Sequence, residues 1–342
     1  MGLLKMPRFF VGQPIISGKK IEITKAEFES LRSARDSVVG LLRFENLYHV
    51  LFGSISEFER HILEATFQDS YRSFEAYQSH FELQIYFDRL RAEANVKMLA
   101  LLSAARAYHD QRNQALGMVS GFEPKSVNDH FREEYDSSFN YRIFEALRNY
   151  SQHANLPIQS VSLSGDNLWS SSHPKADSPS IHRATIKPLI PIKELLADKA
   201  FKAPVSKELQ GAEHLKLDAR ALARSYLASI AKRHLEVTES LGTARDEARD
   251  LMSDYMDRFL GEFAGRDVEH FSVWADDVDT KTWIGSTLTN KLERYQQAKK
   301  RHISIRRGYV SSEITEDAKV LLSEFDDVWV RCRIPHDCRS AS

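Results

Sequence analysis

The sequence predicts a mainly α-helical protein, a helical bundle with a small inserted β-hairpin and a helical C-terminal extension. Long stretches carry apolar side chains at steps of three and four residues, the period of one face of an α-helix. The clearest strand-like alternation, with a period of two, lies near residues 158–187. With 42% hydrophobic and 28% charged residues, the 342-residue chain has the composition of a globular protein with a substantial core.

Helix-capping residues and apolar stripes together place the expected helices. Thr24 and Ser54 are each followed three residues later by a glutamate, Glu27 and Glu57, which is the capping-box pattern of a helix N-terminus. The longest regular stripe lies in residues 83–112. We expect helices from Thr24 onward and over 38–52, 54–80, 83–112, 127–154, 191–198, 214–241, 243–263, 287–301 and 313–326.

Breaks in these patterns divide the chain into three parts. Residues 1–53 are expected to form an N-terminal segment that is irregular at first and then helical. Residues 54–262 are expected to form the main helical domain, with the β-hairpin inserted at about 157–190. Residues 263–342 are expected to form the C-terminal extension.

Composition and cysteine content bound the classes of function. The net charge is −1, so any binding of nucleic acid must come from a local basic patch. The two cysteines, Cys332 and Cys338, form neither a disulfide framework nor a zinc-site pattern, and they fit a reducing cytosol. No apolar run is long enough to span a membrane, and residues 1–4 are too short for a signal peptide. We therefore expect a cytoplasmic protein without a membrane partner, a bound metal or a cofactor.

The stretch most informative about function closes the helix expected over 127–154. Arg148, Asn149 and His153 lie in its last two turns, and Pro157 follows shortly after. The pattern Arg-Asn-x-x-x-His resembles the RNxxxH form of the HEPN motif. The resemblance rests on this short motif and on a compatible helical setting over about residues 54–262.

The resemblance implies both a fold and an activity. HEPN domains are small α-helical bundles, and many are metal-independent ribonucleases of toxin, antiviral and RNA-processing systems that act as dimers. For this chain it implies a homodimeric endoribonuclease of toxin or antiviral defence, without a cofactor and with RNA as the substrate. It implies catalytic roles for Arg148, Asn149 and His153, and it leaves room for a regulatory protein partner.

The three side chains also suit this chemistry on their own properties. Histidine can take a proton from a ribose 2′-OH or give one to the leaving 5′ oxygen, because it titrates near neutral pH. Arginine stays charged and offers a planar fork to phosphate oxygens, and asparagine supplies amide groups that orient a ligand. Five residues along a helix turn by about 500°, so Arg148 and His153 point roughly 140° apart. A two-fold axis that brings two motifs together would overcome this separation.

Three other residues are candidates for supporting roles. Glu145 precedes the motif on the same helix. Arg106 and Asp110, four residues apart on helix 83–112, form either a surface ion pair or a pair that orients the catalytic groups. The densest basic cluster is either solvated or a footprint for the RNA backbone, and it contains Lys299, Lys300, Arg301, Arg306 and Arg307.

An alternative function uses the same helix without catalysis. The protein would then be a helical module that binds RNA, a nucleotide or a protein partner. Arg148 and His153 in one solvent-open cleft would favour the enzyme. A buried His153, or two side chains that face separate surfaces in every assembly, would favour the binding module.

Overall fold

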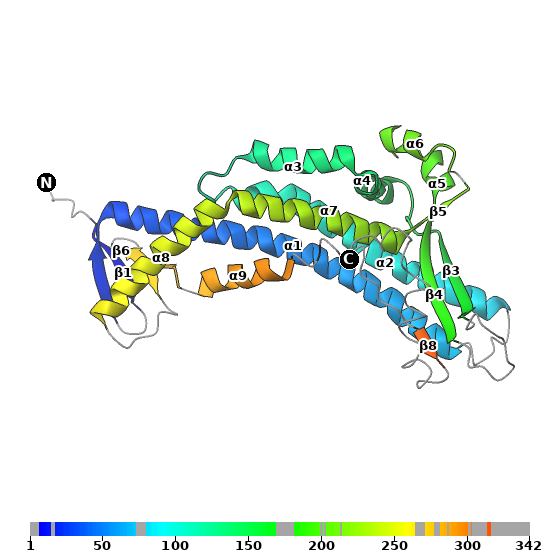
Figure 1. Ribbon diagram of the computed structural model, residues 1–342, viewed down its shortest axis with the longest axis horizontal. Helices are drawn as coiled ribbons and strands as arrows, with labels where there is room; N and C mark the ends of the chain where they lie inside the picture. The colour runs from blue at the N-terminus through cyan, green and yellow to red at the C-terminus, as the bar shows by residue number, and fades with distance from the viewer. Residues whose placement is uncertain are drawn as a thin grey trace, which may run out of the picture.

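The computed structural model has a mainly α-helical architecture, as the apolar periodicity predicts. The molecule is elongated, and its long central helix runs between one small sheet and another at the opposite end (Figure 1). No described helix is both long enough and apolar enough to cross a membrane. The structure describes residues 7–14, 18–72, 80–168, 181–198, 201, 203–212, 214–263, 271–276, 281–285, 287–299, 302 and 313–315.

Two long helices that pack along each other, α1 (Lys25–Arg72) and α2 (His80–Leu116), form the centre of the fold. With 48 residues, α1 is about 72 Å long. A Cβ atom on Gly40 of α1 would lie 2.9 Å from the carbonyl oxygen of Ala115, so the close approach to the end of α2 requires glycine there. The remaining helices are α3 (Pro124–Ser137), α4 (Phe139–His153), α5 (Ile192–Ala197), α6 (Ala203–Leu209), α7 (Ala219–Ser240), α8 (Gly242–Glu262) and α9 (Thr287–Lys299).

The capping box expected at Thr24 is confirmed. The Thr24 amide donates to Glu27 Oε2 at 2.6 Å, and the Glu27 amide donates to Thr24 Oγ1 at 3.2 Å. The helix start expected at Ser54 is wrong, because α1 continues through this residue. The expected domain boundary after residue 53 therefore lies inside a helix. The Ser54 hydroxyl instead donates to the Val50 carbonyl at 2.9 Å, a bond within the helix. The buried stripe simply continues across Ser54, and its packing outweighs the local capping signal.

The single helix expected over 127–154 is also wrong, because α3 and α4 are separate. Ser138 lies between them in an extended conformation, with φ −109° and ψ 107°. Its side-chain oxygen accepts from the Tyr141 amide at 3.4 Å and so caps α4. The helix that carries the motif is therefore short, and it begins at Phe139.

Two small sheets lie at opposite ends of α1 (Figure 1). One has the strand order β2-β1-β6-β7. In the other, β4 lies between β3 and β5, and β8 also pairs with β4. The strands are β1 (Phe9–Gln13), β2 (Lys19–Ile23), β3 (Ser160–Leu168), β4 (Ile181–Pro191), β5 (Lys216–Asp218), β6 (Ser272–Ala275), β7 (Thr282–Trp283) and β8 (Glu313–Thr315).

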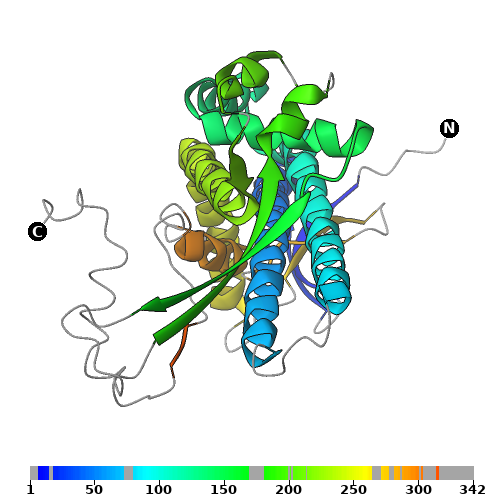
Figure 2. The ribbon, with the colours of Figure 1, turned by 90° about the vertical axis from the view of Figure 1, so that its right-hand side faces the viewer.

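The expected β-hairpin is confirmed, because β3 and β4 pair antiparallel from Ser160↔Leu189 to Leu168↔Ile181. Figure 2 shows these two strands crossing the end of the α1–α2 pair. Two expectations about the chain ends are wrong. Residues 1–23 are not irregular throughout, since β1 pairs with both β2 and β6 and so joins the N-terminal segment to the C-terminal extension. Residues 313–315 form β8 rather than the start of a helix, and residues 316–326 lie outside the described part.

Candidate active site around Arg148

The helix that carries the motif is fixed on several sides. α4 packs against α2, α3, α6 and α7. The Arg142 guanidinium of α4 donates to both carboxylate oxygens of Glu208 on α6, at 3.1 and 2.8 Å. It also donates to the carbonyl oxygens of Tyr135 and Asp136 at the end of α3, both at 2.7 Å. One arginine therefore ties α4 to two neighbouring helices and holds the motif in a defined orientation.

The chain that leaves α4 is held by one buried asparagine of α2. The Asn95 side chain donates to the Ile158 carbonyl at 2.7 Å and accepts from the Ile158 amide at 3.0 Å. It also donates to the Arg91 carbonyl at 3.1 Å within α2. Asn95 is only 2% exposed, so these bonds are shielded from water. The connection between α4 and β3 is anchored at this point.

Arg148 lies in the polar part of α4 that faces its helical neighbours. Its side chain is 14% exposed. Nη1 lies 3.4 Å from Glu145 Oε2, and Nη2 donates to Asn149 Oδ1 at 2.9 Å. The Nε group is buried and has no hydrogen-bond partner among the described residues. The guanidinium thus has a defined position, and part of its donor capacity is not used by the described protein groups.

Glu145, which holds Arg148, is itself held by two other helices. The Tyr226 hydroxyl of α7 donates to Glu145 Oε1 at 2.7 Å, and His109 Nε2 of α2 lies 3.3 Å from the same oxygen. Burial alone would raise the pKa of Glu145. The bonds from His109 and Tyr226 and the charge of Arg148 outweigh burial, so this pKa lies below its ordinary value. Glu145 is therefore an ionised acceptor at neutral pH.

His109 is placed so that its protonated nitrogen can be assigned. The Arg112 guanidinium contacts His109 Nδ1, and a guanidinium has no acceptor, so Nδ1 must accept. We therefore place the ring proton that faces the site on Nε2. This N–H faces the hydroxyl oxygens of Tyr226 at 3.0 Å and Tyr141 at 3.1 Å in addition to Glu145. His109 therefore acts as a donor toward the centre of the site.

Arg112 extends the polar network to a fourth helix. Its Nη2 donates to Asn128 Oδ1 on α3 at 3.0 Å. Its guanidinium lies 4.2 Å from the centre of the Phe131 ring, also on α3. Polar and ionic contacts thus run from Asn128 on α3 through α2 and α7 to Arg148 on α4.

His153 stands apart from this network. It is the last residue of α4 and is exposed. Among the described residues, no hydrogen bond or ion pair joins its side chain to Arg148, to Asn149 or to any other group. The structure therefore keeps Arg148 and Asn149 in contact with each other, while His153 is separate from them within one protomer.

The other predicted site residues divide into three groups. Glu145 contacts Arg148. Arg106 and Asp110 pair with each other on the surface of α2, with side chains 50% and 46% exposed, and this pair has no described contact with Arg148 or His153. Within the basic cluster Lys299 is the last residue of α9, and the other four lie outside the described residues: Lys300, Arg301, Arg306 and Arg307.

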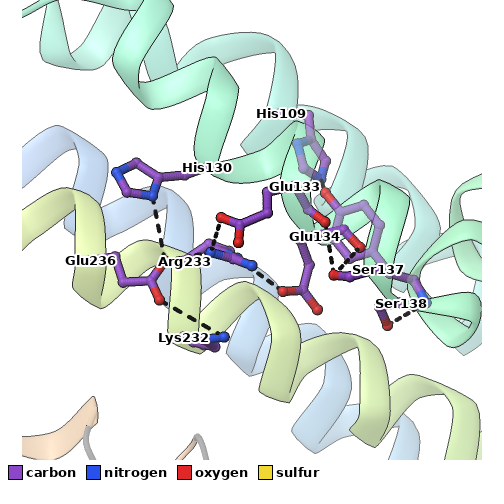
Figure 3. Close-up of polar contacts among 10 residues, drawn as sticks. His109, His130, Glu133, Glu134, Ser137, Ser138, Lys232, Arg233 and Glu236 are labelled. Atoms are coloured by element: carbon purple, nitrogen blue, oxygen red, sulfur yellow. Dashed lines mark hydrogen bonds and ion pairs between the residues drawn. The ribbon is translucent and has the colours of Figure 1, made fainter.

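Another cluster of charged groups lies on α3 and α7 (Figure 3). Arg233 is 5% exposed and donates to three carboxylates at 2.9 Å, those of Glu133, Glu134 and Glu236. His130 Nδ1 lies 3.5 Å from Glu236. Because one guanidinium serves three carboxylates, this cluster fastens α3 to α7 and offers no free cation to a phosphate.

Sequence reasoning missed His109, Arg112 and Tyr226. A signal for the first two was present, because they are three residues apart in a long helix and so share one face. Tyr226 gave no such signal, since it lies among apolar residues of α7 and looks like an ordinary core aromatic. Only the packing of α2, α4 and α7 brings His109 and Tyr226 to Glu145, and Arg112 joins them through His109.

No three or more His, Cys, Asp or Glu residues in the described part of the chain are grouped so as to hold a metal ion. Comparison with protein-family models, with curated proteins and with solved structures finds no match for this chain.

Proposed function

We propose that this protein is a metal-independent endoribonuclease of the HEPN type that acts in toxin or antiviral defence. The observation that carries the proposal is the arrangement at the end of α4. Glu145 and Asn149 hold Arg148 in a fixed position, and the exposed His153 follows in the last turn. A held cation and an accessible imidazole are two groups that cleavage of RNA without a metal requires.

In the proposed reaction the ribose 2′ oxygen attacks the adjacent phosphorus, and the bond from phosphorus to the 5′ oxygen breaks. His153 acts as the general base or the general acid, taking the 2′-OH proton or giving a proton to the leaving oxygen. Arg148 stabilises the extra negative charge on the phosphorane, and Asn149 positions the substrate. The products end in a 2′,3′-cyclic phosphate and a 5′-OH.

The proposed enzyme is a homodimer in which the C-terminal ends of the two α4 helices meet. Two observations favour this assembly. Arg148 and His153 leave their helix roughly 140° apart, and no described contact joins them within one protomer. A two-fold axis would place His153 of each copy beside Arg148 of the other, which gives two equivalent composite sites at the shared cleft.

The alternative is a helical module that binds RNA, a nucleotide or a protein partner without cleavage. One observation favours it: the charge of Arg148 is already opposed by Glu145, and its side chain is 14% exposed. A structural arginine of this kind would orient neighbouring groups of the bundle rather than bind a phosphate. The two functions differ in whether the wild-type protein cuts RNA.

The test is incubation of the pure protein with total RNA in the presence of EDTA. We expect the wild type to produce fragments with 2′,3′-cyclic ends, and His153→Ala to cut about 10² to 10⁴ times more slowly. His214→Ala is the matched control, because His214 is another exposed histidine outside the site, and it should cut like the wild type. Cleavage that survives His153→Ala, or that EDTA abolishes, would refute the proposed mechanism. RNA that is bound and left intact would favour the binding module.

A further inference from the structure

We infer that Tyr226 and His109 are positioning residues, which act through Glu145 to fix the guanidinium of Arg148 for its ligand. The inference rests on the proposed function and adds residues from α2 and α7 to a site that the motif places on α4 alone. On this inference, a connected set of buried polar groups determines how the Arg148 guanidinium is oriented toward RNA. Neither residue needs to touch the substrate.

The first step is that Glu145 has two fixed partners on one oxygen. Oε1 receives the Tyr226 hydroxyl at 2.7 Å and faces His109 Nε2 at 3.3 Å, so Oε2 is left for Arg148 at 3.4 Å. Without these partners the carboxylate could rotate about its terminal torsion, which is broad and weakly restricted. The two donors therefore select the orientation that presents Oε2 to Arg148.

The second step is that both donors are themselves immobilised. Tyr226 is fully buried, and its ring stacks on Phe144 with centroids 4.0 Å apart and planes at 18°. His109 is held at Nδ1 by Arg112, which in turn bonds to Asn128. Because the Tyr226 and His109 side chains are already immobilised, they lose little further conformational entropy when they bond Glu145.

The third step concerns protonation. Around Glu145 the titratable and charged groups are His109 with Arg112 on α2, Arg148 and Tyr141 on α4, and Tyr226 on α7. The lowered pKa of Glu145 means that its carboxylate holds Arg148 above that pKa and releases it as the pH falls through it. Tyr226→Phe removes one of the bonds that lower this pKa, so the pKa must rise. The acid limb of RNA binding must then move to higher pH.

The experiment measures binding of a 2′-O-methyl RNA oligonucleotide, which cannot be cleaved by 2′-OH attack, to the full chain by fluorescence anisotropy. Tyr226→Phe is made alone and together with Arg148→Ala. The control is Tyr108→Phe, which removes a buried hydroxyl that bonds His234 Nδ1 at 3.0 Å and does not contact Glu145. His109→Asn tests the second residue that faces Glu145 Oε1, independently of Tyr226.

We expect Tyr226→Phe to weaken binding about tenfold, to shift the acid limb upward, and to have no further effect once Arg148 is alanine. His109→Asn should behave in the same way, and Tyr108→Phe should bind like the wild type at every pH. A general effect on folding would weaken binding equally in both backgrounds, or would appear in Tyr108→Phe as well, and either result would overturn the inference. Binding of the oligonucleotide with this coupling, but no cleavage of ordinary RNA by the wild type, would refute the nuclease function and keep the positioning role. A wild type that does not bind the oligonucleotide would overturn both.

Discussion

At the scale of single residues, the shape of the Arg148 side chain matters as much as its charge. Its two Nη groups contact different acceptors, Glu145 at 3.4 Å and Asn149 at 2.9 Å. A lysine at this position would carry the same charge on a single nitrogen and could not reproduce the planar fork. The position therefore distinguishes a guanidinium from an ammonium.

We predict that Arg148→Lys lowers RNA cleavage by about 10² to 10³, close to the loss caused by Arg148→Ala, because the donors would no longer lie where charge develops. The measurement is the initial rate of cleavage in EDTA, with thermal unfolding recorded in parallel. Arg106→Lys is the control, since Arg106 is a half-exposed arginine in a surface ion pair and the change should leave the rate unaltered. Full activity of Arg148→Lys would mean that charge alone is sufficient.

At the scale of elements, the long apolar stripes of helices were predictable from the sequence, and the breaks between helices were less so. The stripe of residues 83–112 predicted α2 because its burial against α1 follows directly from periodicity. Ser54 and Ser138 show the limit, since each is a serine with capping potential and only Ser138 caps a helix. Tertiary packing decides which of the two serines lies at a helix start, and the local sequence pattern does not contain this information.

The same limit applies to the candidate site. Arg148, Asn149 and His153 could be identified because they form a short pattern near a helix end. His109 and Tyr226 belong to helices far apart in the sequence, and they meet Glu145 only through packing. Long-range contacts of this kind leave no spacing signal in one sequence.

At the same scale, we predict that Asn95→Ala strongly destabilises the protein. The change leaves the amide and carbonyl of Ile158 without their partner in a buried site, at a cost of about 3 kcal/mol. Urea unfolding measures the loss. Asn46→Ala on α1 is the control, because Asn46 is an exposed helical asparagine and its replacement should change stability by about 0.5 kcal/mol or less. Equal stability of the two variants would contradict the anchoring role of Asn95.

At the scale of the whole molecule, a buried histidine joins the central helices. His234 of α7 is fully buried, with Tyr108 of α2 3.0 Å from Nδ1 and Glu45 of α1 3.3 Å from Nε2. Burial lowers the pKa of His234 to about 3. The unfolded chain, in which a histidine titrates near its ordinary value of about 6.5, binds a proton that the folded protein excludes.

We therefore predict that the contribution of His234 to stability is present above about pH 6.5 and is lost as the pH falls toward 3, at up to about 1.4 kcal/mol per pH unit. Urea unfolding at several pH values measures the slope. His234→Gln should flatten the slope over this range, whatever its stability at neutral pH. His214→Gln, at an exposed position outside the site, is the control for the loss of a histidine elsewhere in the chain. An unchanged slope in His234→Gln would contradict the lowered pKa.

The central claim is that two α4 ends meet in a dimer and that each RNA-cleaving site combines His153 of one copy with Arg148 of the other. The most direct test mixes Arg148→Ala protein with His153→Ala protein in EDTA, after subunit exchange, and measures RNA cleavage. Each variant alone should be inactive. The mixture should recover about a quarter of wild-type specific activity, because half of the dimers are mixed and each mixed dimer keeps one of its two composite sites. A mixture as inactive as its components, beside an active wild type, would contradict the shared site, and a wild type that cuts no RNA would contradict the nuclease itself.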